Sequence, residues 1–162
     1  MLFRSPVVTI PVYDGKFVPL HAPARVSSRN IRDELLKEDS LLPAIYLTQK
    51  LDISVVGIGY PNEKSAIMAT GYFKENEIES LIDRKVAGEL CMQFYDIYGD
   101  TAPYKDDNNV IGMDISMLRS VPRSIGIAGG VEKLRAVRGA INGHYINTLI
   151  TDIECAEALI SE

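Results

Sequence analysis

A glycine pair followed by a lysine is the strongest candidate binding element in the sequence. Gly129 and Gly130 end a short apolar run, and Lys133 stands at the start of a stretch with helical periodicity. Glycines let the backbone approach a ligand closely, N–H groups at a helix start point outward, and the lysine adds positive charge. The pattern indicates anion binding. The alternative is a tight turn followed by a solvated surface lysine.

Glu89 is a second candidate, because it is a carboxylate among apolar neighbours and follows a glycine. A half-buried carboxylate needs a partner, and the hydroxyl groups of a sugar are suitable donors. The alternative is a salt bridge or a surface position. Thr70, Gly71 and Tyr72 form a third candidate, a turn that would offer N–H groups and an aromatic wall. An ordinary turn into a helix is the other interpretation of these three residues.

No group of residues has the spacing of a metal site or of a nucleophile with its base. His21 and His144 are the only histidines, and structural roles are favoured for both. Cys91 and Cys155 lie far apart and lack metal-ligand spacing, so they are interpreted as buried apolar residues in a reducing cytoplasm. We therefore expect no catalytic residue, no metal and no cofactor.

Neither common nucleotide-binding motif is present. The phosphate-loop spacing G-x-x-x-x-G-K-[ST] does not occur. Gly57 and Gly59 approach a dinucleotide turn, but the third glycine is missing and Pro61 follows where a helix should begin. Nucleotide binding is thus weakly supported.

Three short apolar runs must position these candidates. They cover residues 53–58, 124–128 and 147–150, and they are typical of parallel strands that are covered on both faces. Between the last two runs, Val131, Leu134, Val137 and Ile141 share one helical face, which predicts a strand, helix, strand crossover.

Further helices are predicted at residues 30–36 and 75–84, with Ile78, Leu81 and Ile82 as the buried stripe of the second. A closing helix follows a capping box at residues 151–154, with Ile153, Ala156 and Ile160 at helical spacing. Strands that alternate with helices indicate an α/β sandwich.

Three other segments have less regular patterns. Residues 104–109 are polar without periodicity and predict a loop that enters a strand at residues 110–113. Asp14 and Gly15 are a hairpin-turn signal. Residues 86–98 fit neither a helical nor a strand period.

The composition and net charge of the chain argue against some classes of function. The 162 residues are 46% apolar and 24% charged, which suits one domain with one core. With 17 basic and 22 acidic residues the net charge is −5, which argues against DNA binding by this chain alone. Because no signal peptide or long apolar run is visible, we expect a soluble, cytoplasmic protein without a membrane partner.

Short motifs in a fixed order resemble the landmarks of the SorC sugar-binding domain, from about residue 17 to the end. They are the segments at residues 19–24, 56–59, 70–72, 87–89, 111–113, 127–133 and 146–152. The resemblance implies a Rossmann-like α/β sandwich with a mostly parallel sheet, similar to the fold of sugar-phosphate isomerases and deaminases. It also implies an effector domain of a bacterial transcriptional regulator that binds a phosphorylated sugar.

The resemblance assigns the effector site to Lys133 and Glu89, with further contacts from the turn at Thr70, Gly71 and Tyr72. Family members often carry an arginine before this turn, where the sequence has Met68-Ala69-Thr70. One phosphate or hydroxyl contact is therefore expected to be missing or replaced.

Residues 1–16 are atypical of the family, because they lack its first strand, glycine-rich turn and long helix. We accordingly expect residues 1–162 to form one N-terminally truncated effector domain without a DNA-binding domain. By analogy with the family it would form homo-oligomers and reach DNA only through a helix-turn-helix region absent from this chain. The alternative function is a sugar-phosphate isomerase or deaminase, with Glu89 as base and Lys133 holding phosphate.

Overall fold

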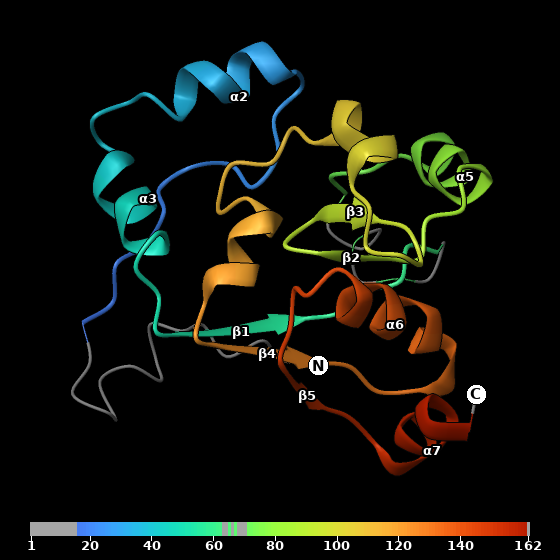
Figure 1. Cartoon of the computed structure of the whole chain (residues 1–162). Helices are drawn as coiled ribbons and strands as arrows, with labels where there is room; N and C mark the ends of the chain where they lie inside the picture. The colour runs from blue at the N-terminus through green and yellow to red at the C-terminus, as the bar shows by residue number, and fades with distance from the viewer. Residues whose placement is uncertain (1–15, 63–64, 66, 68–70, 162) are drawn as a thin grey trace.

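Three parallel strands form the main sheet, in the order β1-β4-β5 (Figure 1). The computed structural model describes residues 16–62, 65, 67 and 71–161. The strands are β1 (Ile53–Gly57), β4 (Arg123–Ile127) and β5 (Thr148–Ile150). In the register Gly57 pairs with Ile127, which in turn pairs with Ile150. All three predicted strands are confirmed, and so is an α/β fold with a parallel main sheet.

The two faces of this sheet differ. On one face, Ser54 and Ser124 are buried, and their hydroxyls form a hydrogen bond of 2.9 Å. On the opposite face, the exposed fractions of Ile53, Val55 and Ile150 are 55, 62 and 53%. The prediction of strands covered on both faces is therefore wrong for the part of the chain that the structure describes. A continuously apolar strand does not reveal which of its faces a helix covers.

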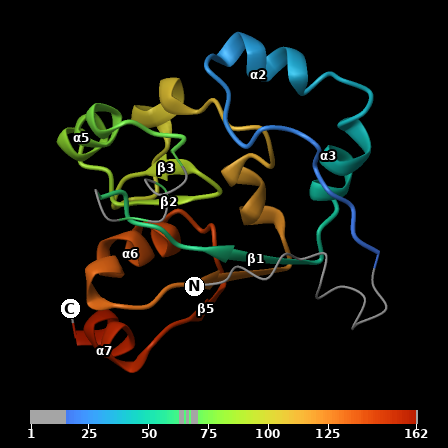
Figure 2. The same cartoon turned by 180° about the vertical axis from the view of Figure 1, so that it is seen from behind.

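The described part of the chain contains five α-helices. They are α2 (Arg29–Leu35), α3 (Leu42–Thr48), α5 (Glu75–Asp83), α6 (Leu134–Asn142) and α7 (Ile153–Ser161). Both views place α2 and α3 at one end of the molecule, and α5, α6 and α7 at the other (Figure 2). The helices predicted at residues 30–36 and 75–84 and the closing helix are confirmed, whereas α3 was not predicted. None of the described helices combines the length and the apolar character needed to cross a bilayer.

In several helices the residues that are buried differ from those that the periodicity predicted. A 3-10 turn, η4 (Val131–Lys133), precedes α6, so Val131 and Ile141 are exposed. The buried face of α6 consists of Ala136, Val137, Gly139 and Ala140. Small residues are favoured there because a Cβ on Gly88 of the neighbouring hairpin would lie only 2.7 Å from Ala136 Cβ. Ile82 is also exposed, contrary to the prediction that it is buried, and Ile153 and Ile160 of the closing helix are exposed as well.

A β-hairpin that the sequence analysis did not predict lies between the two buried clusters of the molecule. Its antiparallel strands are β2 (Gly88–Leu90) and β3 (Gln93–Tyr95). Cys91 and Met92 form its turn with left-handed φ angles of 53° and 61°. Such two-residue turns usually contain Asn-Gly or Asp-Gly, so the Cys-Met pair carried no turn signal.

The segment after the hairpin also differs from expectation. Residues that were predicted as a loop belong to the 3-10 helix η2 (Ala102–Asp107), and a further 3-10 helix, η3 (Ile115–Ser120), precedes β4. Instead of a strand at residues 110–113, Val110 forms a single bridge with Arg25. Pro103 at the start of η2 and the buried Tyr104 side chain explain why this polar segment is helical. The predicted turn at Asp14 and Gly15 lies outside the described residues.

Two buried clusters lie on the two sides of the hairpin. In the first, Tyr95 packs with Tyr145, and the Tyr95 hydroxyl donates to the Ala136 carbonyl at 2.9 Å. In the second, the rings of Phe73 and Phe94 meet edge to face with centroids 5.3 Å apart. Because successive strand residues alternate between faces, the hairpin is anchored in both clusters. This anchoring holds the backbone of Glu89 in place.

Candidate functional site

Glu89 lies beside the carboxyl end of β1. Gly59, just beyond that strand, exchanges two backbone hydrogen bonds with Glu89, of 3.0 and 2.8 Å. The Glu89 side chain folds back against Gly59, so that its carboxylate fills the space where a Cβ of residue 59 would lie. Glycine at position 59 is therefore required for the Glu89 carboxylate to lie this close to the backbone.

The Glu89 carboxylate is half-buried, and opposing effects act on its pKa. Burial raises the pKa of Glu89, whereas a hydrogen bond from the Met92 N–H and the positive charge of Lys133 act to lower it. The Met92 N–H donates to Oε2 at 2.9 Å. The left-handed turn at Cys91 and Met92 aims this N–H at the carboxylate. Backbone strain of this kind is often found at functional sites.

The charge of Glu89 affects the pKa of two further groups, Cys91 and Tyr95. Burial, together with the Glu89 charge, raises the pKa of the Cys91 thiol to about 11. The same two causes raise the pKa of the Tyr95 hydroxyl well above its usual value. Both groups are therefore protonated at neutral pH, and neither is an activated nucleophile or a ready base.

Lys133 lies near Glu89 although the two residues come from separate elements. It ends η4 directly before α6, and its N–H donates to the Gly130 carbonyl at 3.1 Å. The effect of its charge on the pKa of Glu89 places the two groups within electrostatic reach. Within the described residues, however, the Glu89 carboxylate and the Lys133 ammonium form no ion pair.

The turn at Gly129 and Gly130 already holds an anion, which is a side chain of the same protein. The Gly130 N–H, on a residue with φ of 94°, donates to Asp152 Oδ2 at 2.5 Å. Asp152 Oδ1 accepts from the Cys155 N–H at 2.8 Å, so Asp152 caps α7. An external anion must either displace this carboxylate or use other groups of the turn.

The sequence analysis did not identify Asp152 as a residue of the candidate site, although its carboxylate accepts a hydrogen bond from the Gly130 N–H. The available signal was its position directly before the closing helix, where aspartate is a preferred N-cap. The predicted capping box instead gave Thr151 that role, but the buried Thr151 hydroxyl has no hydrogen-bond partner among the described residues.

The contacts of Asp152 predict a pH dependence of stability. N–H donors from Cys155 and Gly130 lower the pKa of Asp152. A lowered folded-state pKa stabilises the fold above the unfolded value, about 3.9, and this stabilisation is lost as the pH falls through the folded value. The difference in unfolding free energy between wild type and Asp152→Asn should therefore be largest near pH 6 and shrink below about pH 4. Urea denaturation from pH 2.5 to 7 measures this difference.

Asp39→Asn, at an exposed position between α2 and α3, is the control for general charge effects. If the difference for Asp152→Asn did not depend on pH, the two N–H contacts would not stabilise the ionised carboxylate.

The turn at Gly71 and Tyr72 is held by an arginine from far along the chain. Gly71 has a left-handed φ of 70° and is exposed. Arg25 donates to the Tyr72 carbonyl at 2.6 Å, pairs with Glu77 at 2.7 Å and stacks over Phe73 at 4.2 Å. The sequence has no arginine directly before this turn, where family members often carry one. Arg25, from a distant part of the chain, contacts the turn instead.

Thr70, the first residue of this turn, lies outside the described residues. The ligand contacts proposed for Thr70, Gly71 and Tyr72 remain predictions. No sequence signal pointed to Arg25, because its partners are distant in the sequence.

Comparisons with known proteins agree with this architecture. The model of a family described as "Putative sugar-binding domain" matches residues 12–161. The chain is 33% identical over 138 residues to the sorbitol operon regulator of Klebsiella pneumoniae, covering 85% of the chain and 44% of the regulator. It is 35% identical over 142 residues to the transcriptional regulator LsrR of Escherichia coli K12, covering 86% of the chain and 45% of LsrR.

The fold is similar to that of a solved regulator. The crystal structure of the full-length sorbitol operon regulator SorC from Klebsiella pneumoniae aligns with a TM-score of 0.76 and 32% identity, covering 85% of this chain and 45% of that chain. The chain thus spans somewhat less than half the length of the curated relatives that it matches.

Proposed function

Since the chain belongs to this sugar-binding domain family of transcriptional regulators, we propose that it binds a phosphorylated sugar as the effector domain of a bacterial regulator. The observation that carries the proposal is the arrangement of Glu89 and Lys133. The positive charge of Lys133 acts to lower the pKa of Glu89, and the ion pairs of the described residues do not join the two side chains. A ligand with hydroxyl groups at one end and a phosphate at the other would contact both side chains.

The position of the two groups supports this assignment. Glu89 lies beside the residues that follow β1, and Lys133 follows the turn after β4. Ligands of open α/β sheets usually bind beyond the carboxyl ends of the strands. A carboxylate accepts hydrogen bonds from sugar hydroxyls, and a lysine ammonium binds phosphate as a point charge. Gly129 and Gly130 would bring backbone N–H groups to the same ligand if the Asp152 carboxylate moved aside.

The proposal predicts stabilisation by sugar phosphates. A ligand at 100 times its dissociation constant stabilises the folded state by about 2.7 kcal/mol. For a domain of this size the expected rise in Tm is roughly 5 to 10 °C. A thermal-shift panel of phosphorylated sugars and their unphosphorylated counterparts, followed by calorimetry, measures the effect. If none of the phosphorylated sugars raised the Tm of the folded chain, the proposal would be wrong.

A sugar-phosphate isomerase or deaminase is the alternative function. The raised pKa of Glu89 would suit a proton-transfer base. The thiol of Cys91 and the hydroxyl of Tyr95 are protonated near neutral pH, however, so neither is a ready second base. Turnover of ribose 5-phosphate or glucosamine 6-phosphate that disappears in Glu89→Gln would favour the enzyme.

The partners follow from the regulator assignment. We propose that residues 1–162 act as one domain, that the protein works in the cytoplasm as a homo-oligomer, and that a separate domain of the regulator contacts DNA. The acidic net charge of −5 is consistent with a chain that leaves DNA contacts to another domain.

A further inference from the structure

A polar cavity of about 330 Å³ lies between α2 and η2. Its lining includes Arg29, Arg32, Tyr104, Asn108, Asp114 and Ser116, and neither Glu89 nor Lys133 belongs to it. Its volume falls at the lower end of the range for small-molecule sites. The cavity is thus large enough for a small metabolite.

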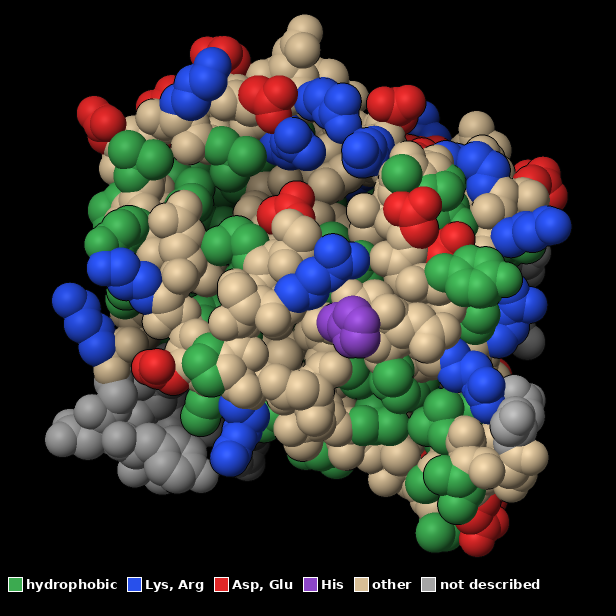
Figure 3. Space-filling model, in the orientation of Figure 1, with side chains coloured by type: hydrophobic (Ala, Val, Ile, Leu, Met, Phe, Trp, Pro, Cys, Tyr) green, Lys and Arg blue, Asp and Glu red, His purple; other side chains and the backbone are tan. Residues whose placement is uncertain are grey.

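Positive side chains gather at this cavity although the whole chain is acidic. Figure 3 shows Lys and Arg side chains grouped on the surface between α2 and η2. Arg29 and Arg32 lie one turn apart on α2, and their side chains are 48 and 19% exposed. Two guanidinium groups at one polar cavity make a favourable environment for an anion.

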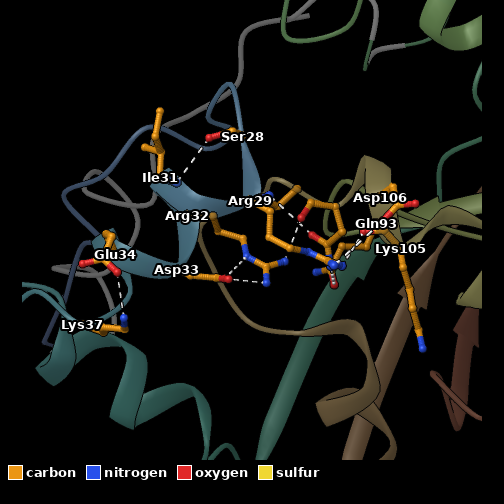
Figure 4. Close-up of polar contacts among 12 residues, drawn as sticks. Ser28, Arg29, Ile31, Arg32, Asp33, Glu34, Lys37, Gln93, Lys105 and Asp106 are labelled. Atoms are coloured by element: carbon orange, nitrogen blue, oxygen red, sulfur yellow. Dashed lines mark hydrogen bonds and ion pairs between the residues drawn. The ribbon is translucent and has the colours of Figure 1, made fainter.

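Both arginines are held in place by backbone carbonyls. Arg29 Nη2 donates to the Lys105 carbonyl at 2.9 Å, and Arg32 Nη1 donates to the Asn108 carbonyl at 2.8 Å. Figure 4 shows the two side chains directed from α2 toward the segment that carries Lys105 and Asp106. A guanidinium has five N–H donors, so each arginine keeps donors for a ligand after making these bonds.

Acidic neighbours neutralise the two arginines unequally. Arg32 pairs closely with Asp33 at 2.8 Å. Arg29 meets Asp106 only at 3.9 Å, and the Asp106 side chain is fully exposed, so this pair contributes little. Arg29 is therefore the guanidinium whose charge is most available to an incoming anion.

Hydrogen bonds hold the polar lining residues that lie outside α2. Gln93 is 4% exposed, and its amide donates to the Met113 carbonyl and accepts from Asn108 and from the Ile115 N–H. Asp114 accepts hydrogen bonds from the N–H and the hydroxyl of Ser116. These contacts fix Asp114, a hydrogen-bond acceptor, in the lining of the cavity.

We propose that this cavity is a separate binding site for a small hydroxylated organic anion. Arg29 and Arg32 would hold its phosphate or carboxylate group, while Asp114 and Asn108 would accept hydrogen bonds from its hydroxyl groups. Because its lining does not include Glu89 or Lys133, the site does not depend on the function proposed above.

Nuclear magnetic resonance titration of the whole ¹⁵N-labelled chain tests the site. The probes are inorganic phosphate in one arm and malate in the other, which separates a phosphate site from a carboxylate site. Binding should shift the amide resonances of Gln93, Asn108 and Ser116. Arg29→Gln should weaken binding of the preferred probe about fivefold, because a half-exposed charge-assisted hydrogen bond is lost.

Two variants serve as controls. Arg123→Gln removes an exposed arginine at the start of β4, outside the cavity, and should leave binding unchanged. Lys133→Ala should also leave these shifts unchanged, even if it abolishes binding of sugar phosphates elsewhere. The double variant Arg29→Gln/Arg32→Gln should abolish the shifts while circular dichroism confirms that the helices remain.

Three results would overturn the proposal. One is the absence of shifts at the cavity with both probes. The second is unchanged affinity in Arg29→Gln, which decides the matter even if the double variant fails to fold. The third is loss of the cavity shifts in Lys133→Ala, since the anion would then bind at the turn after β4.

Discussion

Lys133→Ala should weaken the binding of phosphorylated sugars by about 10- to 100-fold, since a hydrogen bond to a charged group contributes about 1.5–3 kcal/mol. Lys133 is half-buried as a residue, and within the described residues it forms no contact ion pair with Glu89. Removing the Lys133 side chain should therefore change the stability of the fold little and lower the affinity for the sugar phosphate strongly. Calorimetry with the sugar phosphate that gives the largest thermal shift measures the loss.

The unphosphorylated form of the same sugar distinguishes a phosphate contact from a general effect. Its weaker affinity should change much less in Lys133→Ala. Arg135→Ala, at an exposed position on α6, is the matched control and should bind as the wild type does. An equal loss for both forms of the sugar, or an unchanged dissociation constant, would contradict the assignment of Lys133 to the phosphate.

Gly59→Ala should destabilise the fold by about 1–3 kcal/mol and weaken sugar binding about tenfold. A Cβ at this position would overlap the Glu89 carboxylate. Because that carboxylate is the end of a flexible side chain, it would move aside and lose the 2.9 Å hydrogen bond from the Met92 N–H. Urea denaturation measures the first effect and calorimetry the second.

The sequence offers a matched control for this substitution. A Cβ on Gly57, at the end of β1, would meet no atom of the described residues within 4 Å, so Gly57→Ala should change stability by less than about 0.5 kcal/mol. The cost of Gly59→Ala should also largely disappear when Glu89 is already alanine. If Gly59→Ala were equally costly with and without the Glu89 side chain, the effect would come from the backbone and not from the carboxylate.

Local sequence patterns predicted much of the fold. The apolar runs at β1, β4 and β5 and the periodicity of α5 depend only on neighbouring residues, and these elements were found. The hairpin of β2 and β3 was missed, because Cys91 and Met92 adopt left-handed conformations without the usual Gly or Asn. Tertiary packing on both sides of the hairpin stabilises what the local sequence does not favour.

The same division applies to the candidate site. Residue types and their order in the chain identified Glu89 and Lys133 as residues suited to hydroxyl and phosphate groups. Only the tertiary structure showed that the Asp152 carboxylate accepts a hydrogen bond from the Gly130 N–H and that Arg25 supports the turn at Tyr72. It also revealed the cavity at Arg29 and Arg32, which begin a helix that looks like an ordinary charged surface helix in the sequence.

The sequence by itself thus predicted the elements with clear periodicity and the chemical nature of the candidate site residues, because both depend on single residues and on short-range patterns. The tertiary structure decided which side chains lie close together and which sheet face is exposed in the part of the chain that the structure describes. Glu89 and Lys133 are brought together by the packing of the hairpin and α6 around the end of β1, through contacts between segments far apart in the chain. Such contacts depend on the shape and packing of whole elements, which no local pattern records.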